Sequence, residues 1–184
     1  MTEPAAKMRD HYLIVVLWGR RYRNYFTDQC LPSLCTPGNA PRDGFKSKIF
    51  VACPTLDWQV MKCCYPFNIA ELAGYEIEHY EIEAPAEDVL TERVKHATKA
   101  HAALTQLAFE HEAVVTILTP DMVLSDGAMQ WARGKIEGGA HLALAPAMRF
   151  AAEPFLSVYR SNDARDLVAA AIISKHSEME RYAW

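Results

Sequence analysis

The stretch Tyr12-Leu-Ile-Val-Val-Leu-Trp18 decides the fold, because it is an unbroken apolar run that ends at Gly19. Its length and its β-branched centre predict a strand that is buried on both faces, as in a parallel sheet. Two later segments, 48–53 and 113–118, are also mainly apolar, with Pro54 directly after the first and Pro120 two residues after the second. These three segments predict the buried strands of a mainly parallel sheet.

Helical spacing of apolar residues separates the predicted strands almost throughout the chain. It predicts helices over 22–34, 69–73, 86–110, 127–136 and 161–174, with Gly74 ending the second helix and Ser161-Asn-Asp163 capping the last one. Alternating apolar and polar residues over 75–82 predict a half-buried or edge strand, and 141–145 predicts one more strand. This alternation predicts a single three-layer α-β-α domain over 1–184, with helices on both faces of the sheet.

The composition of the 184 residues excludes several broad classes of protein. Apolar residues make up 51% of the chain, charged residues make up 23%, and the net charge of −4 argues against a general nucleic-acid binder. No apolar run approaches the roughly 20 residues that a membrane helix needs. The N-terminus lacks the pattern of a secretory signal, so we expect a cytoplasmic protein, and peripheral contact with a membrane stays open.

The five cysteines form no CxxC pair, and their number is odd. Zinc sites usually show such pairs together with further cysteines or histidines at set spacing. We therefore expect reduced thiols, including the adjacent Cys63 and Cys64, rather than disulfides or a zinc site.

Ligands of parallel sheets bind beyond the carboxyl ends of the strands, so the residues that follow each predicted strand are the site candidates. Gly19 follows the first strand and would let a ligand approach the backbone, with the positive charge of Arg20, Arg21 and Arg23 close by. On residue types alone, Gly19 could equally only turn the chain beside solvated arginines. Neither GxGxxG nor GxxxxGK[ST] occurs in the sequence, so neither a dinucleotide fingerprint nor a P-loop is predicted.

Polar residues also follow the second and third buried strands. Thr55 and Asp57 could bind the base or the ribose of a nucleotide, or Thr55 could cap the next helix. Asp121 and Asp126 lie at the end of segment 113–118, where a carboxylate suits a hard divalent cation that bridges to a diphosphate. The alternative is that Asp121 is a turn residue and that Asp126-Gly127 forms a turn or a helix cap.

Several stretches together resemble bacterial glycosyltransferase-like proteins of the GT-A fold, the fold of the nucleotide-diphospho-sugar transferases. The resemblance rests on Val15-Val-Leu-Trp-Gly19 with Tyr22, Leu31-Pro-Ser-Leu34, Pro37-Gly-Asn-Ala-Pro41, Leu118-Thr-Pro-Asp-Met-Val-Leu-Ser-Asp-Gly127 and Asp163-Ala-Arg-Asp-Leu-Val168. It implies a manganese or magnesium ion at Asp121, although Thr119 replaces the first carboxylate of the family's Asp-x-Asp motif. By the same resemblance, the nucleotide would lie among Gly19, Tyr22, Thr55 and Asp57, with Lys95, Lys99 or His101 near its ribose or phosphates.

The function implied by this resemblance is transfer of a hexose, most simply from a uridine-diphosphate donor, to an acceptor that the sequence does not identify. The chain stops at Trp184, whereas enzymes of this fold continue with segments that form the acceptor pocket. Two alternatives therefore stay open. One is a non-catalytic nucleotide-sugar binder with a degenerate metal motif, and the other is a Rossmann-like regulatory or interaction domain.

Overall fold

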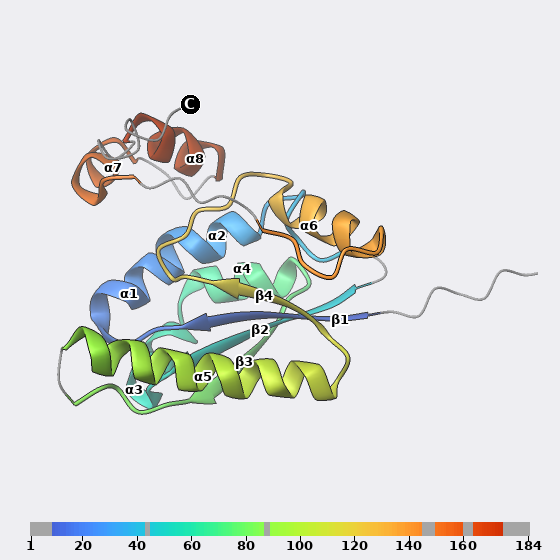
Figure 1. Cartoon of the computed structure of the whole chain (residues 1–184). Helices are drawn as coiled ribbons and strands as arrows, with labels where there is room; N and C mark the ends of the chain where they lie inside the picture. The colour runs from blue at the N-terminus through green and yellow to red at the C-terminus, as the bar shows by residue number, and fades with distance from the viewer. Residues whose placement is uncertain (1–8, 43–44, 87–88, 145–149, 160–163, 175–184) are drawn as a thin grey trace, which may run out of the picture.

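In the described part of the chain, four strands form one parallel sheet (Figure 1). Three of them come from the predicted apolar runs, and the fourth comes from the alternating segment 75–82. The computed structural model describes residues 9–42, 45–86, 89–144, 150–159 and 164–174. Strands β1 (Arg9–Val16), β2 (Phe45–Cys53), β3 (Glu76–Glu81) and β4 (Val114–Leu118) are arranged in the order β3-β2-β1-β4. Every strand pair is parallel, so the carboxyl ends of all four strands lie at one edge of the sheet.

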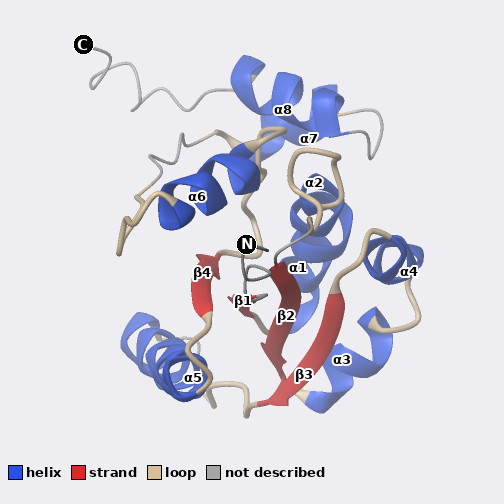
Figure 2. Ribbon diagram, turned by 90° about the vertical axis from the view of Figure 1, so that its right-hand side faces the viewer, coloured by secondary structure: helices blue, strands red, loops and turns tan. Residues whose placement is uncertain are grey.

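Helices cover both faces of the sheet (Figure 2). The long helix α5 covers one face, and the helices that follow β1 and β2 cover the other. The helical elements are α1 (Gly19–Tyr25), the π-helical η1 (Phe26–Cys30), α2 (Leu31–Leu34), α3 (Thr55–Met61), α4 (Tyr65–Leu72), α5 (Leu90–Glu110), α6 (Ala128–Glu137), α7 (Ala152–Val158) and α8 (Ala164–Ile173). No helix of the described ranges has the length and apolar character needed to span a bilayer.

Alternate residues of β1 enter two separate hydrophobic clusters, which is why the first apolar run has no polar face. Leu13 and Val15 pack with Phe26 beneath the α1-to-α4 layer. Ile14 packs with Leu104 of α5 on the opposite face. The predicted burial of this strand on both faces is therefore confirmed.

Strand β4 differs from its prediction, because it is an edge strand of the described sheet rather than a fully buried one. Its Ile117 is 47% exposed. Residues 141–144, predicted as part of a further strand, adopt no strand conformation, and Ala145 lies outside the described residues. Leu142 and Leu144 are exposed, so this segment has no buried face that would hold it in a sheet.

The remaining elements follow the sequence pattern with shifted boundaries. The helix predicted over 22–34 begins at Gly19 and contains the π-helical turn η1, and the helix predicted over 69–73 begins at Tyr65. Gly74 has φ +98°, which agrees with its predicted role at the end of α4. The predicted cap at 161–163 lies outside the described residues. The five cysteines are free thiols, as expected.

Candidate functional site

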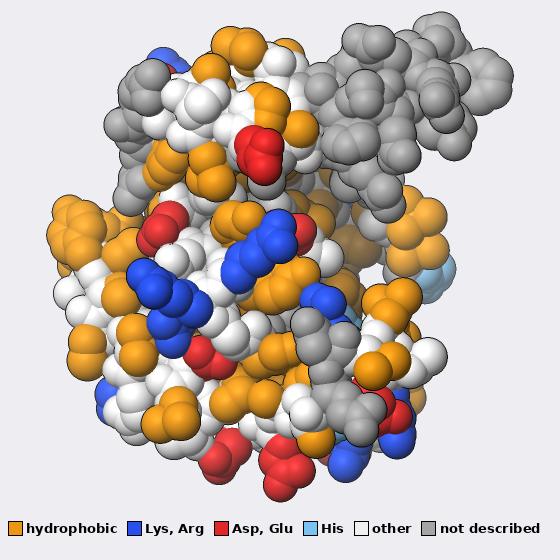
Figure 3. All heavy atoms as spheres, turned by 90° about the vertical axis from the view of Figure 1, so that its left-hand side faces the viewer, with side chains coloured by type: hydrophobic (Ala, Val, Ile, Leu, Met, Phe, Trp, Pro, Cys, Tyr) orange, Lys and Arg blue, Asp and Glu red, His pale blue; other side chains and the backbone are white. Residues whose placement is uncertain are grey.

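The strand order places the topological switch point of the sheet between β1 and β4, the position where parallel sheets commonly bind ligands. The chain after β1 supplies Gly19 to Tyr22 at this edge, and the chain after β4 supplies Thr119 to Asp121. Figure 3 looks onto this end of the molecule and shows basic side chains gathered across it. The segments after β1 and β4, two of the three that sequence reasoning selected, therefore flank this switch point.

Asp57 joins the third segment to the first through two hydrogen bonds. The backbone N–H of Gly19, at φ +79°, donates to Asp57 Oδ2 over 2.8 Å. The guanidinium of Arg23 donates to Asp57 Oδ1 over 2.9 Å, and the Asp57 residue is only 9% exposed. Both carboxylate oxygens are thus engaged, so Asp57 acts as a positioning residue that fixes the start of α1 against α3.

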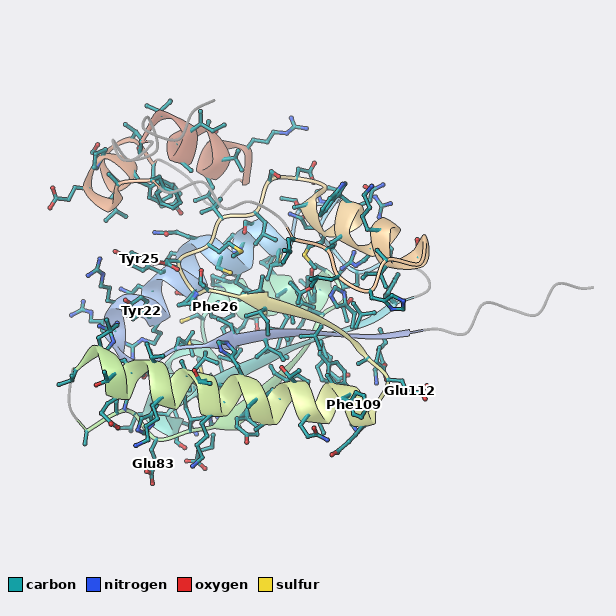
Figure 4. The ribbon with its side chains drawn as sticks, in the orientation of Figure 1. Tyr22, Tyr25, Phe26, Glu83, Phe109 and Glu112 are labelled. Carbon is teal, nitrogen blue, oxygen red and sulfur yellow. The ribbon has the colours of Figure 1, made fainter. Side chains whose placement is uncertain are left out.

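Two tyrosines of α1 hold guanidinium groups at the same edge. Arg93, in the first turn of α5, donates to the hydroxyl of Tyr22 over 3.0 Å. Arg21 donates to the hydroxyl of Tyr25 over 3.1 Å and lies over its ring, 5.4 Å from the ring centre. Tyr22 and Tyr25, labelled in Figure 4, are half-buried, and Tyr22 packs against the core cluster that contains the buried Phe26. A ligand at this edge would therefore meet aromatic rings and positive charge together.

Asp121 is exposed in the turn that follows β4. The hydrogen bond to Tyr25 raises the pKa of the Arg21 guanidinium, and the negative charge of Asp121 adds to this effect. The carboxylate of Asp121 therefore lies within electrostatic reach of Arg21.

Asp126 binds the backbone of a neighbouring loop, which is a structural role, and it is not grouped with Asp121 at the end of β4. Its Oδ1 accepts a hydrogen bond from the backbone N–H of Gly38 over 2.9 Å. The contact is close, because a Cβ atom added at Gly38 would lie 2.6 Å from that oxygen. Asp126 thus anchors the loop after α2 to the start of α6.

The donor atoms near Asp121 restrict the kind of metal ion that could bind. Within the described ranges, no three His, Cys, Asp or Glu side chains gather in a group that could hold a metal. Magnesium and manganese are often bound by one or two carboxylates together with water and substrate phosphates. Asp121 therefore fits a cation that is shared with a bound diphosphate, and it does not fit a metal site made by the protein alone.

The other predicted site residues lie in different surroundings. The hydroxyl of Thr55 donates to Glu81 at the end of β3, and Thr55 does not cap α3, whose N-cap residue is Pro54. Lys99 and His101 lie about halfway along α5. At roughly 1.5 Å per residue they are about 14 to 17 Å along the helix axis from Leu90, so they are distant from the start of α5. Burial lowers the pKa of His101, which disfavours its charged form.

Arg93 and Glu81 are site residues that sequence reasoning did not select. Arg93 lies one turn into α5, and Glu81 ends β3, so both belong to segments that begin or end at the carboxyl edge. The same rule that selected Gly19 and Asp121 would have found them if it had been applied to β3 and to the helix after it.

The chain was compared with protein families, curated proteins and solved structures. No protein-family model, curated protein or solved structure matches the chain. The fold and the edge described above define an α/β protein with a four-stranded parallel sheet and a charged switch-point site. Any narrower functional class rests on the residues themselves.

Proposed function

We infer that this chain has a GT-A-type fold and binds a nucleotide-diphospho-sugar, most simply a UDP-hexose, at the switch point between β1 and β4. The observation that carries this proposal is that β1 and β4 are parallel neighbours, so the chain after β1, with Arg21, and the chain after β4, with Asp121, leave the sheet side by side at the switch point. A guanidinium is suited to the oxygens of a phosphate, and a lone carboxylate is suited to a cation that accompanies the phosphates. The sequence resemblance supports the same ligand class.

Each residue of the edge has a separate task in this proposal. Arg21 attracts the diphosphate, while its contact with Tyr25 restricts the orientation of the guanidinium. Tyr22 presents an aromatic ring beside the nucleotide, and Arg93 orients that ring. Asp57 keeps the backbone of Gly19 in place. A bound manganese or magnesium ion at Asp121 would neutralise charge on the departing diphosphate.

Transfer of the sugar to an acceptor is the reaction that this geometry would serve, with the protein positioning the donor and stabilising the leaving group. The second candidate function is binding of the nucleotide-sugar without transfer. It is favoured by the use of Asp126 as a loop anchor, because Asp121 is then the single carboxylate of this segment left for a cation.

Isothermal titration calorimetry with UDP and UDP-hexoses, with and without Mn²⁺, tests the proposal. We expect binding that Mn²⁺ strengthens and that Asp121→Ala weakens at least tenfold, which corresponds to about 1.4 kcal/mol. Glu137→Ala is the matched control, because it removes an exposed carboxylate at the end of α6 and should bind UDP as the parent protein does.

The outcomes separate the competing functions. Slow hydrolysis of a bound UDP-hexose, or transfer to an added acceptor, supports the transferase, whereas binding without turnover supports the non-catalytic binder. No heat of binding for UDP or UDP-hexoses at millimolar concentration would overturn the proposed site and leave a regulatory or interaction domain.

A further inference from the structure

Helix α6 lies over the amino end of the strands, opposite to the end that carries Asp121 (Figure 1). A second cluster of polar side chains comes from α6 and from the first residues of β1 and β2. His11 of β1, Ser47 of β2 and Arg133 of α6 are 1%, 2% and 4% exposed. His11 and Ser47 are register partners on neighbouring strands, so their side chains lie on the same face of the sheet. Phe45 contacts two of the three residues, because its ring centre is 6.0 Å from both the His11 ring centre and the Arg133 Cζ atom. Phe45 and Ser47 are two residues apart on β2 and both are buried, so their side chains lie on the same face of the sheet.

The positive charge of Arg133 has no acidic partner among the described residues. Its Nη1 and Nη2 atoms donate to the backbone oxygens of Ala40, over 2.7 Å, and Asn39, over 3.1 Å. Its Nε is buried without a hydrogen-bond partner in the described part of the chain. Buried charges in proteins are normally paired with an opposite charge, so this guanidinium is unusual.

Two further polar atoms of the cluster are buried without a partner in the described ranges, Ser47 Oγ and His11 Nδ1. His11 Nε2 lies 2.8 Å from the hydroxyl of Thr116. When Nε2 accepts the hydrogen bond from Thr116, the proton of the neutral ring is on Nδ1. The cluster then presents three unused donors, which are an imidazole N–H, a hydroxyl and a guanidinium N–H.

We propose that Arg133 Nε, Ser47 Oγ and His11 Nδ1 bind a small monovalent inorganic anion of the chloride type inside the protein. An anion accepts hydrogen bonds from all three donors and balances the charge of Arg133. A water molecule could satisfy the hydrogen bonds, but it would leave the guanidinium charge without a counterion. The site lies at the end of the sheet opposite to Asp121, so it does not depend on the proposed function.

Crystals of the full chain grown in sodium bromide provide the direct test. We expect an anomalous bromide peak within hydrogen-bonding distance of Arg133 Nε and Ser47 Oγ, inside the protein beneath α6. Density for a water molecule without an anomalous peak, or side chains that close the space between these atoms, would overturn the proposal.

Thermal unfolding in chloride and in gluconate at equal ionic strength tests the same site in solution. Chloride should raise the Tm of the parent protein in a saturable way, by about 3 to 5 °C at tenfold excess over its Kd. Ser47→Ala keeps the guanidinium and removes one donor, so it should weaken chloride binding about two- to tenfold. Arg133→Met should abolish the chloride effect, whereas Lys135→Met, which removes an exposed charge from the same helix, should retain it.

If Arg133→Met does not fold, Ser47→Ala decides the solution test. An equal chloride response in the Ser47→Ala and parent proteins, or a parent Tm that is the same in chloride and gluconate, contradicts the proposal. Binding of UDP does not affect either result, because the proposed nucleotide site lies at the carboxyl ends of the strands and the anion site lies at their amino ends.

Discussion

Asp57→Ala should destabilise the protein strongly, because one carboxylate holds together the starts of two helices. The substitution removes the acceptor of the Gly19 N–H and the counterion of Arg23, at 2.8 and 2.9 Å. The side chains of Asp57 and Arg23 are 12% and 19% exposed, so water replaces these contacts only in part. Hydrogen bonds to charged groups contribute about 1.5 to 3 kcal/mol each, and breaking a buried ion pair costs about 3 to 5 kcal/mol. Because the pair is partly exposed, we expect a loss of about 3 kcal/mol.

Equilibrium urea unfolding, followed by tryptophan fluorescence, measures this loss. Asp57→Asn retains an oxygen for Gly19 and removes the charge, so it should lose less than Asp57→Ala. Glu137→Ala removes an exposed carboxylate and should change the free energy of unfolding by less than about 0.5 kcal/mol. A double-mutant cycle with Arg23→Met should give a coupling of at least about 1 kcal/mol. A loss below about 1 kcal/mol for Asp57→Ala, at an unchanged m-value, would refute the claim that Asp57 positions α1.

Three further substitutions test the packing around the amino end of the sheet and around α6. Burial, with the charge of Arg133, lowers the pKa of His11 from 6.5 to about 3, so the folded state excludes a proton that the unfolded chain binds. The free energy of unfolding should therefore fall as the pH falls from 6.5 towards 3, by up to about 1.4 kcal/mol per pH unit, and His11→Gln should reduce that slope in urea titrations between pH 7.5 and 5. Gly38→Ala should lower the free energy of unfolding by about 2 kcal/mol or more, because its Cβ would lie 2.5 Å from the backbone nitrogen of Gly127. Gly134→Ala, where the added Cβ meets nothing within 4 Å inside α6, should instead raise it by about 0.5 to 1 kcal/mol, and equal effects of the two alanines would contradict this account.

The sheet could be predicted because burial on both faces leaves a local trace in the sequence. The run from Tyr12 to Trp18 has no polar position, and helix α5 carries its apolar residues at helical spacing. The position of a strand within the sheet leaves no such trace. Segment 113–118 is apolar except for Thr116, yet β4 is an edge strand of the described sheet rather than a central one. Helix α3 was missed because it begins directly after β2 and spans only Thr55–Met61.

The candidate site could also be predicted only in part. The sequence shows which residues follow each strand, but it does not show which distant residues they contact. The rule that ligands meet the carboxyl ends of parallel strands selects Gly19 and Asp121 without a structure. No local pattern indicates that the Asp57 carboxylate accepts a hydrogen bond from the N–H of Gly19, 38 residues away. The same holds for the Asp126 carboxylate, which accepts a hydrogen bond from the N–H of Gly38, 88 residues away. Partner choice depends on how the loops fold over the sheet, so the sequence could name these carboxylates and could not assign their roles.

Asp57 is held by hydrogen bonds and, in the described part of the chain, Asp121 is not, so substitutions of the two residues test the proposed function differently. Loss of Asp57 would move the start of α1, and with it Gly19 and the arginines, so weaker UDP binding in that variant would have two explanations. Asp121 is exposed, and no hydrogen bond within the described ranges holds it. Its removal should therefore leave the free energy of unfolding unchanged within about 0.5 kcal/mol. A loss of UDP binding in Asp121→Ala at unchanged stability is then a property of the site itself.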